Sequence, residues 1–252
     1  MQLLGIDIGG TGIKGAPVNV ETGTLLAERV RIPTPQPATP DAVIGTIKEL
    51  VQQFNWDGPI GCGFPAAIKN ETVMTAANID NSWIGISATT YMSERVGCPI
   101  HLINDVDAAG YCEMAFGAGK GNDGVVIVVA AGTGIGTAIF TNNQLLPNTE
   151  LGHLKMRGDS AEKFASNAAR KNEGIKIEAW ARRFSEYLNY LEALFWPDLF
   201  VLGGGISKKY DSYAHALTIK TRMVPAQNLN NAGIIGAALA AKEAGFGIEA
   251  VS

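Results

Sequence analysis

The order of hydrophobic and polar positions along the chain predicts an α/β protein. Short apolar runs that end in glycine or proline predict buried strands. Stretches with apolar residues three and four positions apart predict helices with one buried face. The expected strands span residues 3–8, 13–20, 24–31, 60–64, 99–103, 124–130, 137–140 and 199–202. The expected helices span residues 41–54, 91–96, 106–116, 160–170, 175–195 and 232–244.

One pattern occurs twice in this order. A strand, a glycine-rich turn and a returning strand are expected at residues 3–20 and again at 124–140. A weak internal repeat of this kind is typical of two related lobes. Because no linker rich in proline, serine or charge separates the halves, we expect two closely packed lobes with a cleft between them. The N-terminal lobe should span 1–105, completed by a C-terminal helix at 234–252, and the C-terminal lobe 106–233.

The composition excludes several classes of protein. With 252 residues, 46% of them apolar and 17% charged, the chain can build a large core and is not disordered. A formal net charge of −4 gives no general attraction to nucleic acids or anionic membranes. The first residues lack the basic region and apolar run of a signal peptide. We therefore expect a cytoplasmic protein with no nucleic-acid or membrane partner.

A glycine-rich turn follows the first expected strand. Gly9, Gly10 and Gly12 carry no side chains, so backbone N–H groups there can come close to an anion, and Thr11 adds a hydroxyl donor. Asp7, at the strand end, can hold a magnesium ion directly or through water. A plain hairpin would have the same sequence, so this turn alone does not decide the matter.

Two further glycine clusters also end expected strands. The first is Gly132–Gly136, which contains a second Gly-Thr-Gly sequence with Thr133 and Gly134. Two such turns can clamp a phosphate chain from opposite sides of a cleft. The other cluster, Gly203-Gly204-Gly205, suits the close approach of a planar base or a phosphate.

Polar residues capable of acid–base chemistry stand at the end of the strand expected at 99–103. A carboxylate there, Asp105, can accept the proton of an attacking hydroxyl group in phosphoryl transfer. The amide of Asn104 offers both a donor and an acceptor to a sugar hydroxyl. The competing interpretation is that Asp105 or Asp107 only caps the helix that follows.

Several other polar residues are candidate sugar ligands. Glu150 and His153 can supply an acceptor and a donor from one turn. Glu162 is a further acceptor, although a glutamate at the start of a helix is also favoured by the helix dipole. Asn78 lies in an irregular, asparagine-rich stretch, 69–87, that is typical of a binding loop.

With these residues in place, the chain resembles the ROK (repressor, open reading frame, kinase) branch of the sugar kinase, Hsp70 and actin superfamily. The resemblance runs from Leu4 to the helix after Ala232. The resemblance is strongest in four segments, which are similar to segments of ROK kinases that use inorganic polyphosphate and occur in the same order as in those kinases. These segments are 7–16 (DIGGTGIKGA), 34–40 (TPQPATP), 147–154 (PNTELGHL) and 196–200 (WPDLF).

The resemblance implies a two-lobed, actin-like (ribonuclease H-like) ATPase fold with a central cleft between the lobes. It also implies roles for individual residues. Asp105 matches the catalytic base, and Asp7 the residue near Mg²⁺. The sugar ligands are Asn78, Asn104, Asp105, Glu150, His153 and Glu162, and the phosphate- or nucleotide-binding residues are Asp7, Gly9, Gly10, Thr11, Gly12, Lys14, Gly132, Thr133, Gly134, Gly136, Gly203, Gly204 and Gly205.

The reaction that the resemblance implies is transfer of a phosphoryl group from inorganic polyphosphate to the 6-hydroxyl of glucose, with ATP as a second donor. One alternative is an ATP-dependent kinase for another hexose, such as mannose or an N-acetyl sugar. Another is a non-catalytic sugar sensor like the ROK repressors, against which Asp105 and the lack of a DNA-binding segment before Leu3 both argue. The resemblance further implies a homodimer.

A polyphosphate donor requires a local basic track, because the whole chain is acidic. Lys208, Lys209, Lys220 and Arg222 follow the third glycine cluster and are the candidates for this track. The same residues could instead form an ordinary solvated face.

Cysteine usage bears on metal binding. Cys62, Cys98 and Cys112 match no zinc or redox spacing, and we expect them to be small buried hydrophobic residues. Many ROK proteins carry a cysteine-rich zinc site just after their Gly-His pair. The corresponding stretch here, residues 155–166, contains no cysteine, so we expect no structural zinc.

Overall fold

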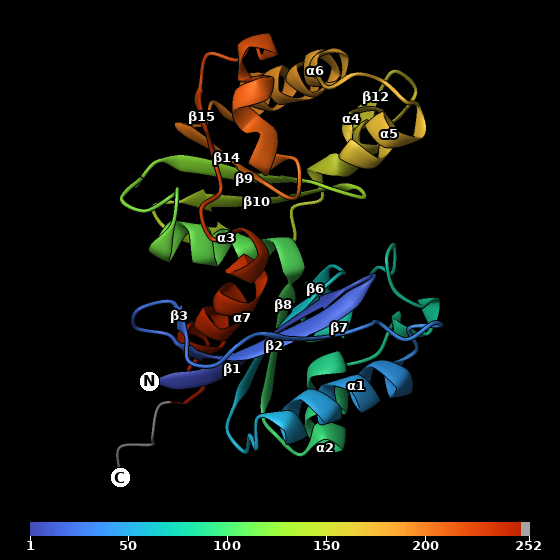
Figure 1. Cartoon of the computed structure of the whole chain (residues 1–252), viewed down its shortest axis with the longest axis vertical. Helices are drawn as coiled ribbons and strands as arrows, with labels where there is room; N and C mark the ends of the chain where they lie inside the picture. The colour runs from blue at the N-terminus through green and yellow to red at the C-terminus, as the bar shows by residue number, and fades with distance from the viewer. Residues whose placement is uncertain (248–252) are drawn as a thin grey trace. The chain divides into compact units, whose positions relative to one another are not determined.

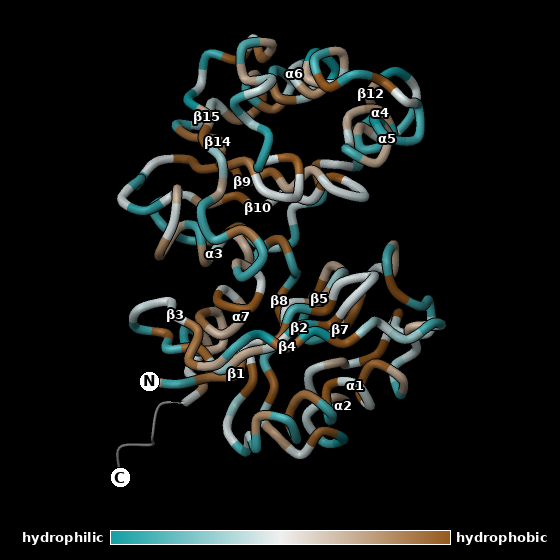
Figure 2. Tube along the Cα trace, viewed as in Figure 1, coloured by the Kyte–Doolittle hydropathy of each residue, from teal (hydrophilic) through white to brown (hydrophobic). Residues whose placement is uncertain are grey.

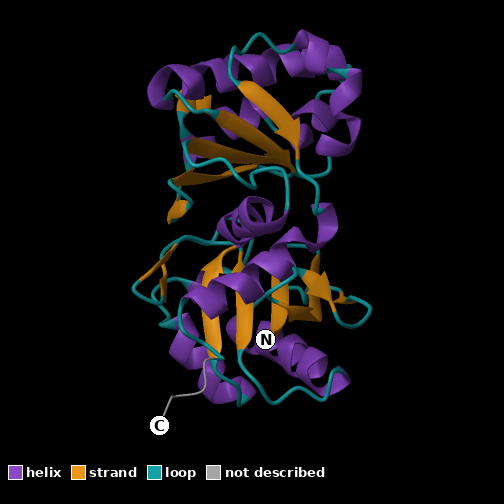
Figure 3. Cartoon of the chain, turned by 90° about the vertical axis from the view of Figure 1, so that its left-hand side faces the viewer, coloured by secondary structure: helices purple, strands orange, loops and turns teal. Residues whose placement is uncertain are grey.

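The structure, a computed structural model, describes residues 1–247. It has a mixed α/β, actin-like fold of two compact units, each with its own sheet flanked by helices (Figures 1 and 3). Unit 1 comprises Met1–Cys112 and the C-terminal segment from Asn230, and unit 2 comprises Glu113–Leu229. The lobe boundaries suggested by the sequence, after residues 105 and 233, stay a prediction.

The sheet of unit 1 has six strands in the order β3-β2-β1-β5-β8, and β4 also pairs with β2. β1 and β2 form an antiparallel hairpin, whereas β1, β5 and β8 are parallel. The carboxyl ends of the parallel strands therefore meet at one edge of the sheet, where ligands bind in open α/β sheets. The strands are β1 (Gln2–Gly9), β2 (Gly12–Asn19), β3 (Thr24–Leu25), β4 (Val30–Ile32), β5 (Ile60–Phe64) and β8 (Ile100–Asn104).

Helices cover both faces of this sheet. On one face, Leu4, Ile6 and Ile8 of β1 pack in a buried core with residues of α1 and α2. On the other face α7 lies directly on the strands, because glycines leave room for its backbone (Figure 1). A Cβ atom added at Gly61 would lie 1.9 Å from the carbonyl oxygen of Ala237. The helices of unit 1 are α1 (Pro40–Gln53), α2 (Ala88–Val96), α3 (Asp105–Phe116), which runs on into unit 2, and α7 (Ala232–Glu243).

The sheet of unit 2 has the same plan. Its order is β11-β10-β9-β14-β15, with β10 antiparallel to β9, and β9, β14 and β15 parallel. The order and directions match those of β3-β2-β1-β5-β8, so the internal repeat expected from the sequence is confirmed. The strands are β9 (Val125–Ala131), β10 (Ile135–Thr141), β11 (Gln144–Leu146), β14 (Leu199–Gly203) and β15 (Arg222–Pro225).

The core of unit 2 packs the central strands against one long helix. Trp180 and Phe184 are buried and stacked with ring centroids 4.9 Å apart, and Trp180 Nε1 donates to the carbonyl oxygen of Ala165 at 2.8 Å. Hydrophobic residues follow the central strands in both units (Figure 2). The helices are α4 (Ala161–Ala165), α5 (Asn167–Asn172) and α6 (Ile177–Phe195). Short elements complete the chain: β6 (Ile68–Lys69), β7 (Thr72–Val73), η1 (Asn81–Trp83), η2 (Leu151–His153), β12 (Lys155–Met156), β13 (Asp159–Ser160), η3 (Ser207–Ser212), η4 (Ala214–Ala216) and η5 (Leu229–Asn231).

Three elements expected from the sequence are wrong in detail. The C-terminal helix expected at 234–252 ends at Glu243, and residues 248–252 of that expectation lie outside the described residues. The single strand expected at 24–31 is two short strands, β3 and β4, which pair with different parts of β2. The single helix expected at 160–170 is broken at Ser166, whose backbone is extended. The hydroxyl of Ser166 accepts from the N–H of Ala169 at 3.1 Å and so begins a new helix, α5. The three cysteines are buried as expected.

None of the helices within residues 1–247 combines the length and the apolar character that crossing a membrane requires.

Gly61→Ala should destabilise the protein by about 3 kcal/mol, because the new methyl group collides with the backbone of α7. Gly45→Ala is the matched control. Gly45 is exposed on α1, and a Cβ atom there would meet nothing within 4 Å. This substitution should stabilise the fold by about 0.5–1 kcal/mol. Urea unfolding of both variants measures the difference, and equal effects would contradict the packing described for α7.

Candidate functional site

The first glycine turn closes the β1–β2 hairpin in unit 1, where Gly9 pairs with Gly12. Side chains of β4 and of the segment that follows it donate hydrogen bonds to the carbonyl oxygens of this turn. Thr34 Oγ1 donates to the carbonyl oxygen of Gly9 at 2.5 Å, and an Arg31 guanidinium nitrogen donates to that of Thr11 at 2.7 Å. Gln36 Nε2 adds a longer bond of 3.4 Å to the carbonyl oxygen of Gly10. The peptide groups of the turn are thus held in a fixed orientation.

The residues that provide this support were not expected from the sequence to act at the site. The sequence signal for Thr34 and Gln36 is that residues 34–40 form one of the four ROK-like segments, and Arg31 lies outside that segment. Their contribution is visible only once the chain folds back onto the turn. Asn78 is exposed, and its backbone lies beside the turn, since its carbonyl oxygen is 3.4 Å from the position of a Cβ atom at Gly10.

Asp7 lies two register positions before the Gly9–Gly12 pair and faces Lys14 across the hairpin. Lys14 Nζ is 2.8 Å from Asp7 Oδ2, and both side chains are partly exposed. Within residues 1–247 no three His, Cys, Asp or Glu side chains gather into a cluster that could hold a metal ion. Asp7 still fits the usual Mg²⁺ arrangement, in which one or two carboxylates and the substrate phosphates share the ion.

The two polar residues at the end of β8, Asn104 and Asp105, have different roles. Asn104 is buried, and its Oδ1 accepts from the N–H groups of Val106 at 2.9 Å and Asp107 at 3.1 Å. Its Nδ2 donates to the carbonyl oxygen of Ala66 at 3.1 Å. Asn104 therefore caps α3, a task that the competing interpretation had given to Asp105 or Asp107.

Asp105 is the first residue of α3 and is half-buried. Its Oδ1 shares the N–H of Val106 at 2.9 Å. Gly63 of β5 lies next to it, with a Cβ position 3.6 Å from the Asp105 Cα, and the same glycine pairs with Asp7 in the sheet. The structure thus brings Asp7, the first glycine turn and Asp105 to one edge of the unit 1 sheet.

In unit 2 the three expected sugar ligands form one cluster. His153 Nε2 is 3.6 Å from Glu150 Oε2, and His153 Nδ1 is 3.7 Å from Glu162 Oε1. Burial raises the pKa of the Glu150 carboxyl above its usual value, His153 opposes this rise and Glu162 adds to it. Two carboxylates, which accept hydrogen bonds, and an imidazole, which can donate or accept, therefore converge within reach of a small polar molecule.

Glycines join this cluster to the second glycine turn. Glu162 Oε2 accepts from the N–H of Ile135 at 3.3 Å, and a Cβ atom at Gly134 would lie 2.3 Å from the same oxygen. A Cβ atom at Gly152 would lie 2.0 Å from the carbonyl oxygen of Ile135. Neither position can accept a side chain without movement of its neighbours.

The third glycine cluster adjoins the second because β9 and β14 are parallel neighbours. Gly203 pairs with Ala130, and Gly204 has a φ of +79° and a Cβ position 2.7 Å from the carbonyl oxygen of Ala131. The N–H of Ala168 in α5 donates to the carbonyl oxygen of Gly132 at 3.0 Å. The glycine-rich ends of two strands and the start of α5 thus meet in unit 2.

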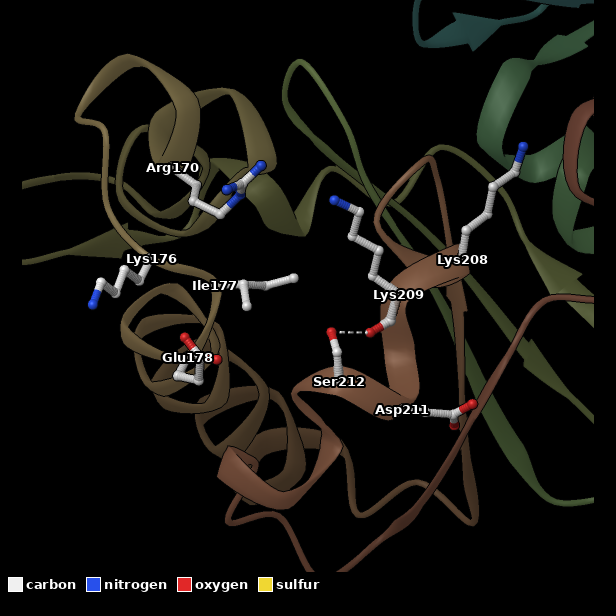
Figure 4. Close-up of a pocket in the computed structure, with 8 residues that line it drawn as sticks. All are labelled: Arg170, Lys176, Ile177, Glu178, Lys208, Lys209, Asp211 and Ser212. Atoms are coloured by element: carbon white, nitrogen blue, oxygen red, sulfur yellow. Dashed lines mark hydrogen bonds between the residues drawn. The ribbon is translucent and has the colours of Figure 1, made fainter.

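The four expected basic residues separate into two pairs. Lys208 and Lys209, on η3, line a groove of about 730 Å³. Lys220 and Arg222 are exposed and are not among its lining residues. The groove gains two cations that sequence reasoning missed, Arg170 and Lys176, because they are distant in the chain and only the fold brings them near η3 (Figure 4).

Replacing Glu150 tests the electrostatics of the cluster. Because the pKa of Glu150 is raised in the folded state, its protonated carboxyl stabilises the fold relative to its ionised form. This stabilisation is full below the pKa of the unfolded state and is lost as the pH rises through the pKa of the folded state. Glu150→Gln should therefore raise the Tm by about 1–2 °C at about pH 7 and leave it unchanged at about pH 4.

The control for this measurement is Glu94→Gln, which changes an exposed glutamate on α2 and should give no pH-dependent difference in Tm. A Glu150→Gln protein less stable than wild type at neutral pH would refute the stated cause.

Comparisons with known proteins place these features in a family. A model described as "ROK family" matches residues 3–172. Polyphosphate glucokinase from Mycobacterium tuberculosis is 46% identical over 94% of this chain and 89% of its own length. The crystal structure of inorganic polyphosphate/ATP-glucomannokinase from Arthrobacter sp. strain KM superposes with a TM-score of 0.92 at 43% identity, covering 96% of this chain and 99% of that one. The crystal structure of a ROK family glucokinase from Streptomyces griseus, in complex with glucose and AMPPNP, superposes with a TM-score of 0.83 at 25% identity. The match covers 96% of this chain and 100% of that one.

Proposed function

The chain belongs to the ROK family, and from that premise we propose that it transfers the terminal phosphoryl group of inorganic polyphosphate to the 6-hydroxyl of glucose, giving glucose 6-phosphate. ATP serves as a second donor. The observation that carries this proposal is 46% identity to a polyphosphate glucokinase along 94% of the chain. The sites described above supply the chemical groups that such a reaction needs.

Asp105 is the proposed catalytic base. It takes the proton from the 6-hydroxyl while the glucose oxygen attacks the terminal phosphorus. Its position at the end of β8, fixed by the Asn104 cap, supports this role because a base must be held at a defined distance from its proton.

The proposed sugar ligands are Asn78 and Asn104 from unit 1 together with Glu150, His153 and Glu162 from unit 2. The carboxylates accept hydroxyl protons, and the imidazole donates or accepts. The cap restricts what Asn104 can do. Its Oδ1 already accepts two bonds and one amide N–H is used, so it offers glucose a single N–H donor.

The glycine-rich turns are the proposed phosphate-binding elements, because their N–H groups can offset charge that develops on the phosphoryl oxygens. Asp7 would hold Mg²⁺, directly or through water, and the ion would neutralise phosphate charge. Lys14 forms a salt bridge with Asp7, and its positive charge partly offsets the charge of this carboxylate. The phosphate-binding residues of this proposal are Asp7, Gly9, Gly10, Thr11, Gly12, Lys14, Gly132, Thr133, Gly134, Gly136, Gly203, Gly204 and Gly205.

A second hexose is a specific alternative substrate. The Arthrobacter relative is named a glucomannokinase, which favours mannose as a further acceptor for this chain. A cytoplasmic location and a homodimer complete the proposal and rest on the family resemblance.

Asp105→Ala should lower turnover by about 10³-fold while glucose binding stays measurable. Asp105→Asn should be equally inactive, because it keeps an oxygen for the N–H of Val106 but cannot accept the proton. A coupled assay for glucose 6-phosphate measures turnover, and calorimetry measures glucose binding. Asp41→Asn, which changes an exposed carboxylate in the first turn of α1, should retain full activity. An Asp105→Asn protein with a tenth of wild-type turnover would eliminate the assignment.

The substrates are tested by assaying polyphosphate and ATP at matched phosphate against glucose and mannose. We expect glucose to be phosphorylated with both donors. Binding of sugar without phosphorylation by either donor would instead support a sensor.

A further inference from the structure

The groove between α5, the start of α6 and η3 has a lining suited to a polyanion. Its eight lining residues include four cations, two acids and one apolar side chain. The volume, about 730 Å³, lies within the range of small-molecule sites. The lining residues are Arg170, Lys176, Ile177, Glu178, Lys208, Lys209, Asp211 and Ser212.

We propose that this groove binds the phosphates of the polyphosphate chain that lie beyond the transferred one, with Arg170 and Lys209 as the central contacts. The inference rests on the proposed function, and it names the part of the molecule that recognises the length of the donor.

Two cations face the groove from opposite walls. Arg170 extends from α5 and Lys209 from η3 toward the same space, with Ile177 between them (Figure 4). Lys208 and Lys176 also line the groove, and their side chains extend away from the space between Arg170 and Lys209 (Figure 4). A polyanion in the groove would therefore be held mainly between Arg170 and Lys209.

The charges of this track are available to a ligand. No salt bridge joins Arg170, Lys176, Lys208 or Lys209 to any other residue within 1–247. Arg170 is oriented by a bond of 2.9 Å from its Nε to Asn167 Oδ1, which leaves its terminal nitrogens for phosphate. Asn167 is therefore a positioning residue for the track.

The groove is connected through the chain to the glycine clusters of the site. Lys208 and Lys209 follow Gly203–Gly205 after two buried residues, and Arg170 lies on the helix whose Ala168 bonds to Gly132. A phosphate chain held at these glycines would thus find the basic residues on the elements that extend from them. Lys220 and Arg222, the other pair of the expected track, lie outside this lining.

The lining favours phosphates over the base of a nucleotide. Sites for a base or drug-like ring are lined mainly by apolar and aromatic side chains. Here Ile177 is the one apolar member of the described lining, and the net charge of the lining is two positive, from four cations and two acids. The distal phosphates of polyphosphate carry repeated negative charge, which this lining can neutralise. The base of ATP carries no negative charge and would gain nothing from these cations.

The test compares three donors: long-chain polyphosphate, tripolyphosphate and ATP. The double variant Arg170→Gln with Lys209→Gln should raise the KM for long-chain polyphosphate about tenfold, with kcat unchanged, and the KM for ATP by less than about twofold. The effect on tripolyphosphate should be smaller than on the long chain. The dependence of log kcat/KM on log salt for the long chain should flatten by about 0.7 for each lost contact, as for single-stranded nucleic acid.

Lys171→Gln is the matched control, since Lys171 is exposed on the same helix but outside the groove. It should change none of these constants. The proposal is overturned if the double variant affects all donors equally or none, if Lys171→Gln has the same effect, or if Lys220→Gln with Arg222→Gln weakens long-chain polyphosphate use more strongly.

Direct binding separates this inference from the proposed function. If wild type forms glucose 6-phosphate from some donor, the function stands whatever the groove variants do. If no donor is used, calorimetric titration with long-chain polyphosphate still tests the groove: a tenfold weaker affinity in the double variant supports it, and equal affinity refutes it. Absence of any polyphosphate binding by wild type refutes it as well.

Discussion

The close approach of backbone to backbone at glycine is the constraint on which the rest of this structure depends. At Gly152 the space for a Cβ atom is already occupied by the backbone carbonyl group of Ile135. At Gly204 the positive φ and the carbonyl of Ala131 impose the same condition. Peptide N–H groups can therefore be presented at the ends of parallel strands, where side chains would otherwise cover them.

Both units repeat one sheet topology, and each places a different set of polar residues at the same edge of its sheet. Each unit ends its first parallel strand in a glycine turn and places carboxylates near that edge. In unit 1 these are Asp7 and Asp105, and in unit 2 they are Glu150 and Glu162. The first pair suits phosphate and proton transfer, whereas the second pair, joined by His153, suits hydroxyl groups.

Local signals in the sequence were sufficient for most of the fold, and contacts between distant segments explain what they missed. The hairpin, α1, α6 and the parallel strands other than β15 follow from short-range periodicity and glycine position. No strand was expected at β15, Arg222–Pro225. The break at Ser166 depends on a single side-chain cap, and the division into β3 and β4 depends on pairing with β2. The role of Asn104 as cap could not be chosen over Asp105 or Asp107, since asparagine and aspartate both cap helices. Arg170 and Lys176 join η3 only through the fold.

Direct donation of the phosphoryl group by polyphosphate requires no nucleotide. The decisive experiment combines polyphosphate labelled with ³²P at its terminal phosphates, glucose and Mg²⁺, with every nucleotide removed. We expect the label to appear in glucose 6-phosphate during the first turnover. Label released only as inorganic phosphate, or transferred only after ADP is added, would contradict it.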